Sequence, residues 1–178
     1  FDYFTAVDDH KAKDDEEDAG AGMIGTVEFN ASTLYRYATI DVDALQKNLG
    51  DVEATRRAVA AFVRAFATSM PTGKQNTFAN RTLPNAVVIS VRDTQPVSLV
   101  GAFEKAIVGD DRVATASKRL ADEAREIDAA FGTTPVEGWV VRTGDATAAL
   151  DELSRRVSLD QAVQQLGDAV AQRLAGQP

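Results

Sequence analysis

Cysteine is absent from the 178-residue chain, and histidine occurs only once, at His10. The lack of cysteine excludes disulfide scaffolds, thiolate-bound metal centres and thiol nucleophiles, and a single histidine excludes metal sites built from several imidazoles. No apolar run approaches the roughly 20 residues that a membrane-spanning helix needs. We therefore expect a soluble, cytoplasmic protein without a membrane partner or a cofactor. Hydrophobic residues make up 44 % of the chain, which is ordinary for a globular domain.

The charge is strongly uneven along the chain. The formal net charge of −8 argues, at face value, against a nucleic-acid partner. However, residues 1–20 carry a net charge of −6, whereas residues 51–92 carry +4. The acidic segment from Asp8 to Asp18 has no apolar side chain larger than Ala12. It cannot bury a face, so we expect a mobile acidic loop, with a divalent-metal site as the alternative.

Apolar periodicity and capping residues predict an α+β fold with a mostly antiparallel sheet. β-branched and aromatic residues predict strands at 1–7, 23–30, 32–40, 86–91 and 136–142. The first two of these should pair as a hairpin. Predicted helices begin at the caps Asp41, Asp51 and Ser158 and end at Gly50, Pro71 and Gly176, and two more lie at 98–108 and 113–131.

The polar loop at 71–84 contains Gly73-Lys74, which is reminiscent of a phosphate-binding loop. The complete pattern needs a glycine where Thr68 stands and a serine or threonine where Gln75 stands, so a Walker loop is excluded. Many hydrogen-bond donors remain in this loop, which leaves two readings open: contact with a nucleic-acid backbone, or an ordinary polar connection.

Five stretches in order along the chain resemble one protein family. They are Asp2-Tyr-Phe-Thr-Ala-Val-Asp-Asp9, Gly25-Thr-Val-Glu-Phe29, Tyr35-Arg-Tyr-Ala38 followed by Leu45-Gln-Lys-Asn-Leu-Gly50, Gly73-Lys-Gln-Asn-Thr-Phe-Ala79 and Ala102-Phe-Glu-Lys-Ala106. Together they resemble the backbone subunit of the type I-E CRISPR surveillance complex Cascade, the CasC family. The resemblance runs from residue 1 to about 107, is weaker over 108–156 and returns loosely in the last helix.

The resemblance implies part of a modified RNA-recognition (ferredoxin-like) palm. Residues 1–30 would form its thumb hairpin, and residues 31–178 would hold the C-terminal part of the palm with appended helices, the N-terminal part of a longer protein being absent. The implied function is a non-enzymatic scaffold that polymerises along crRNA and supports recognition of target DNA. Its implied partners are crRNA, target DNA, further copies of itself and other Cascade subunits.

The resemblance also implies the residues that contact nucleic acid, and it implies neither catalytic residues nor metal ligands. Phe4, Thr5 and Val7 match the thumb strand, where side chains wedge beside a flipped nucleotide. An aromatic or β-branched side chain can replace the stacking that is lost when a base turns out. A second group matches a family loop close to RNA backbone or to a neighbouring subunit: Lys74, Gln75 and Thr77.

Two other functions remain open. Asp8, Asp9 and neighbouring acids could serve a metal-dependent RNA nuclease, although such chemistry needs carboxylates held rigidly around the ions. The chain could also be a protein-only interaction module.

Overall fold

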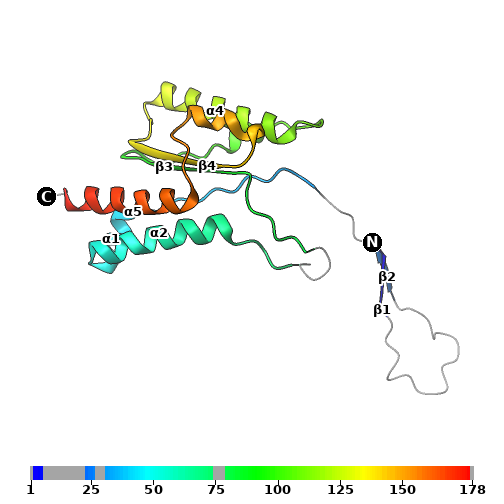
Figure 1. Cartoon of the computed structure of the whole chain (residues 1–178), viewed down its shortest axis with the longest axis horizontal. Coiled ribbons are helices and arrows are strands. Elements are labelled where there is room, and N and C mark those ends of the chain that lie inside the picture. Colours follow the sequence, from blue (N-terminus) through cyan, green and yellow to red (C-terminus); the bar gives the residue numbers. More distant parts are fainter. Residues whose placement is uncertain (1, 6–22, 27–30, 74–78, 177–178) are drawn as a thin grey trace, which may run out of the picture. The chain divides into compact units, whose positions relative to one another are not determined.

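The computed structural model describes residues 2–5, 23–26, 31–73 and 79–176, which belong to two units, Phe1–Leu34 and Tyr35–Pro178 (Figure 1). In the first unit, β1 (Asp2–Thr5) pairs antiparallel with β2 (Met23–Thr26). The predicted pairing of these two segments is confirmed. The acidic segment between them lies outside the described residues.

The second unit opens with two helices whose ends follow from local sequence. α1 (Val42–Leu49) begins at Asp41, whose carboxylate accepts a hydrogen bond from the Ala44 amide, and ends at Gly50 with a φ of 67°. Glycine suits that left-handed conformation because it has no Cβ. α2 (Val52–Thr68) begins at Asp51, which caps the Ala54 amide in the same way. The predicted helix starts are confirmed.

The sheet of the second unit has two antiparallel strands, β3 (Ala86–Val91) and β4 (Glu137–Arg142), in a register that pairs Ile89 with Trp139. Along the other edge of β4, the Val140 amide donates to the Arg155 carbonyl at 3.0 Å, and the Val157 amide donates back to the Val140 carbonyl at 2.9 Å. A short parallel bridge therefore extends the ladder beyond β4.

Helices cover both faces of this sheet (Figure 1). On one face, α5 (Leu159–Ala175) and α2 pack together, and their cluster includes Val59, Leu166 and the buried Trp139. On the other face lie α4 (Arg112–Phe131) and the 3₁₀ segment η2 (Asp145–Glu152). Leu150 of η2 and Val140 of β4 are buried in the cluster on this face. This layering explains why β3 and β4 are rich in apolar residues without strict alternation.

Two predicted elements are wrong. Residues 32–40 form neither strand nor helix, although their composition favours a strand. No partner strand pairs with them among the described residues, and their side chains contact other elements instead, as set out below. The helix predicted at 98–108 is reduced to the single 3₁₀ turn η1 (Val100–Phe103).

The apolar residues that recur at helical spacing along α2, Val59, Phe62, Val63 and Phe66, are buried to very different degrees. Val59 is buried and Val63 packs against the core, as expected for residues facing α5. Phe62, however, is 43 % exposed. The α+β fold with antiparallel pairing is confirmed, whereas the finer assignments to a ferredoxin-like palm and to a domain boundary at residue 30 stay predictions.

Candidate nucleic-acid interface

The structure places two of the six predicted contact residues, and only at the level of the backbone. In the β1–β2 hairpin, Phe4 pairs with Ile24 and Thr5 pairs with Met23. Lys74, Gln75, Thr77 and Val7 lie outside the described residues. The structure therefore does not describe the position of the thumb residues relative to the loop residues, and the roles of both groups stay predictions.

The two ends of the predicted loop are described. α2 ends at Thr68, and the Ser69 amide donates to the Ala65 carbonyl, which closes the last helical turn. In the second half of the loop, Ala79 has a φ of 51°, and the Arg81 amide donates to the Ala79 carbonyl at 2.7 Å. The chain therefore turns sharply within the loop before it enters β3.

Tyr35 attaches the incoming chain to η1. Its hydroxyl accepts a hydrogen bond from the Leu99 amide at 3.1 Å, and its ring lies 5.2 Å from the Phe103 ring, between centroids. Two of the sequence stretches noted above, around residues 35–38 and 102–106, are thus in direct contact.

Arg36 turns to a different element, the C-terminal end of α2. Its guanidinium donates to the Ser69 carbonyl at 3.0 Å and lies 4.3 Å from the centre of the Phe66 ring. A cation over an aromatic face is attractive, and the hydrogen bond satisfies a carbonyl just past the helix end. Arg36 therefore anchors the point from which the loop containing Lys74 departs.

Tyr37 follows Arg36 in the same segment, residues 35–38. Partial burial, together with the nearby Tyr35, raises the pKa of its hydroxyl above the usual range, while Arg92 acts in the opposite direction. The hydroxyl is thus protonated at neutral pH and able to donate a hydrogen bond.

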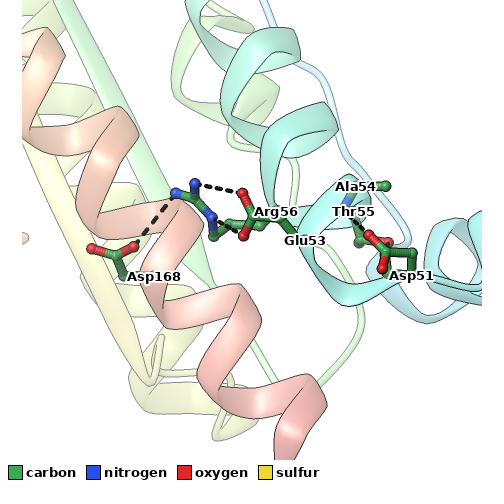
Figure 2. Close-up of polar contacts among 6 residues, drawn as sticks. All are labelled: Asp51, Glu53, Ala54, Thr55, Arg56 and Asp168. Atoms are coloured by element: carbon green, nitrogen blue, oxygen red, sulfur yellow. Dashed lines mark hydrogen bonds and ion pairs between the residues drawn. The ribbon is translucent and has the colours of Figure 1, made fainter.

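The cationic stretch at 51–92 is less basic in the fold than in the sequence. Arg56 donates to both carboxylate oxygens of Glu53, at 2.7 and 2.8 Å, and lies 3.6 Å from Asp168 of α5 (Figure 2). This pairing lowers the pKa of the Glu53 carboxyl and raises that of the guanidinium. Arg64 pairs with Asp160 of α5 at 2.6 Å.

Another arginine of this stretch, Arg92, has a largely buried side chain. Arg92 pairs with Asp128 of α4 at 2.6 Å, and the two side chains are only 11 % and 15 % exposed. Sequence inspection misses Asp160 and Asp128 as partners, because they lie 96 and 36 residues from their arginines along the chain. Charge counted along the sequence thus overstates the positive potential of this surface.

No group of three or more metal-ligating side chains gathers within the described part of the chain. Asp8 and Asp9, on which the nuclease alternative depends, lie outside it. None of the described helices is both long and apolar enough to cross a membrane.

The chain is similar to proteins of known structure and to one protein family. Two chains of solved assemblies are similar to it. One, from a CRISPR RNA-guided surveillance complex, is 32 % identical with a TM-score of 0.74, over 98 % of this chain and 65 % of that one. The other, from a CRISPR RNA-guided surveillance complex, pre-nicking, is 34 % identical with a TM-score of 0.75, over 97 % of this chain and 45 % of that one. The chain thus spans less than two thirds of either, and no curated protein matches it.

These likenesses confirm the predicted resemblance to subunits of CRISPR surveillance complexes, while the assignment to the CasC type stays a prediction. The family model of CT1975-like proteins matches residues 1–165, which is most of the chain. The chain therefore belongs to the CT1975-like protein family.

Proposed function

We propose that this chain is part of a non-enzymatic, guide-RNA-binding scaffold subunit of a CRISPR surveillance complex, one that polymerises along crRNA and supports recognition of target DNA. The observation that carries the proposal is the extent of the structural likeness. Nearly the whole chain, 98 % and 97 % of it, superimposes on chains of such complexes at TM-scores of 0.74 and 0.75. At about one third identity, so complete a match favours a shared role in the assembly.

Two features support this role at the level of residues. Phe4 and Thr5 lie on a two-stranded hairpin, a shape suited to projecting side chains toward a neighbouring molecule. Arg36 holds the end of α2 from which the loop with Lys74, Gln75 and Thr77 departs. Phe4 and Thr5 therefore lie in a strand, and the loop with Lys74 is attached to the end of a helix.

The direct test is co-purification of RNA with the complete protein expressed beside a CRISPR array and the other subunits. We expect an RNA of defined length that stays intact, in an assembly that weakens as salt rises because phosphate contacts release counterions. Assemblies that form equally well after nuclease treatment would favour the protein-only module. Magnesium-dependent cleavage of RNA that disappears in Asp9→Asn would favour the nuclease.

Two substitutions test the predicted contact residues within that assembly. Phe4→Ala should weaken assembly on RNA while the protein stays folded, with Phe131→Ala as control because Phe131 is 77 % exposed at the end of α4. Lys74→Ala should reduce the dependence of RNA binding on salt by about one counterion. Its control is Lys118→Ala, since the partner of Lys118 among the described residues is Asp122, on the surface of α4. Unchanged filament length and salt dependence would remove these residues from the interface.

A further inference from the structure

Phe62 and Phe66 are large aromatic residues of α2 that belong to neither hydrophobic core. The helix turns Val59 and Val63 toward α5, and these two join the core cluster around Trp139. Phe62 lies off that stripe and is 43 % exposed. Phe62 therefore belongs to neither core cluster, and part of its side chain is open to solvent.

The two rings form a column with Arg36. The Phe62 and Phe66 rings are stacked, with centroids 5.9 Å apart and planes 13° from parallel, and the Arg36 guanidinium lies 4.3 Å from the centre of the Phe66 ring. Its hydrogen bond to the Ser69 carbonyl holds the guanidinium in place. The column, defined as Phe62, Phe66 and Arg36, is thus fixed at one end and exposed at Phe62.

The chain around this column is free of acidic residues. Residues 54–91 contain five basic and no acidic side chains, and residues 29–40, which include Arg36, also lack acids. The carboxylates that pair with α2 are Glu53 of α2 itself and Asp168 of α5, which approach Arg56, and Asp160 of α5, which pairs with Arg64. Neither of those arginines belongs to the column. Arg36, whose described contacts are the Ser69 carbonyl and the Phe66 ring, has no carboxylate partner among the described residues, so the column favours an anionic ligand over an acidic peptide.

We propose that this column is a stacking platform for an unpaired base of a single-stranded RNA. The half-exposed Phe62 ring, stacked nearly parallel to Phe66, offers an aromatic face to solvent, and bases stack on such faces with little regard to sequence. The adjoining guanidinium adds a cation that favours a nucleotide over an apolar side chain. This proposal rests on the proposed function, since it adds an RNA contact at α2 to the predicted contacts of the hairpin and the loop.

The test compares the affinity of the complete protein for an oligoadenylate and for an abasic oligomer with the same number of phosphates. Phe62→Ala should bind the oligoadenylate about 10-fold more weakly, because base stacking on an aromatic ring is lost. Its affinity for the abasic oligomer should not change, because phosphate contacts remain. Phe62→Tyr should restore the preference, and Phe62→Leu, apolar but without a flat face, should not.

Phe131→Ala serves as the matched control, since it removes a more exposed phenylalanine from α4. Equal affinities of Phe62→Ala and the unsubstituted protein for the oligoadenylate would overturn the platform, as would an equal loss for both oligomers. Loss of self-association in nuclease-treated Phe62→Ala would instead assign the column to a protein contact, which also overturns it. If the unsubstituted protein bound neither oligomer, the proposed function itself would fail.

Discussion

Trp139 is the residue on which the larger core depends most. Its side chain is fully buried on β4, and its indole N–H donates to the Gln165 side-chain oxygen at 2.7 Å. The same oxygen accepts a hydrogen bond from Arg155, also at 2.7 Å. The polar edge of the indole is thus satisfied, so its whole apolar area contributes to stability.

Replacing Trp139 by Ala should lower the free energy of unfolding by about 3–5 kcal/mol, because a large cavity opens beneath α5. Urea denaturation followed by circular dichroism measures the change, since the chain has no other tryptophan to report by fluorescence. Phe131→Ala, at an exposed position, should stay within about 0.5 kcal/mol of the original protein. Equal midpoints for the two variants would contradict the burial of Trp139.

The Arg92–Asp128 pair is the most enclosed ion pair of the described residues that joins two elements. Asp128 accepts a second hydrogen bond from the Thr133 hydroxyl at 2.8 Å, which helps to offset the loss of water around its charge. The pair fixes the end of β3 against α4.

Arg92→Met should cost roughly 3 kcal/mol, because it leaves the largely buried Asp128 carboxylate without its cation. The double variant Arg92→Met/Asp128→Leu should be more stable than Arg92→Met, since no charge is then left uncompensated. A double-mutant cycle on denaturation midpoints measures the coupling. Additive effects would show that the two side chains do not interact.

At the scale of elements, helix ends are decided by a few local hydrogen bonds. The start of α5 is a complete capping box: the Ser158 hydroxyl accepts from the Gln161 amide at 3.2 Å, and the Gln161 side chain accepts from the Ser158 amide at 3.0 Å. α5 supplies much of the buried face against α2. Its first turn therefore affects the whole core.

Ser158→Ala should lower stability by about 1 kcal/mol, because the Gln161 amide in the first turn loses its acceptor. Ser158→Gly should cost only a few tenths of a kcal/mol, since glycine is tolerated at this position. Thermal melts of the two variants provide the comparison. A larger loss for glycine than for alanine would contradict the capping role.

Local signals explain which parts of the fold could be predicted. Asp41, Gly50 and Asp51 mark helix ends because each acts on amides or carbonyls within four residues. The strand predicted at 32–40 fails because a strand needs a partner, and no residue within that segment can supply one. Tyr35 and Arg36 instead contact η1 and α2, 30 or more residues away.

The same reasoning applies to the candidate interface. Phe4, Thr5 and the residues of the loop were predicted from resemblance, and nothing in the described structure tests their contacts with RNA. The column of Phe62, Phe66 and Arg36 could not be predicted, because helical spacing assigns both rings to one stripe facing the core. Only the contact of Arg36 with Phe66, 30 positions along the chain, separates them from that stripe.

At the scale of the whole molecule, acid should destabilise the fold. Hydrogen bonds from neighbouring cationic side chains lower the carboxyl pKa of Asp151, through Arg142, and of Asp122, through Lys118 and Arg125. The unfolded chain regains protons near the ordinary value of about 4, above the pKa of these groups in the folded chain. It therefore binds more protons than the folded chain as pH falls through this range, and folding stability decreases.

The expected profile is a stability that is constant near neutrality and falls below about pH 4.5. Asp151→Asn should flatten the acid limb, since the amide does not titrate. Denaturation midpoints at successive pH values measure both profiles. An acid limb equally steep in the two proteins would mean that Asp151 does not contribute.

The packing of α5 against α2 has a consequence for synthesis. The buried face of α5 covers Val59 and Trp139, yet its residues leave the ribosome last among the elements of the core. Pairs such as Arg64 and Asp160, separated by 96 positions, can form only after the start of α5 has been made. Contacts of such long range slow folding. Nascent chains should therefore wait with α2 uncovered, and chaperones that bind apolar helices have their longest access during that interval.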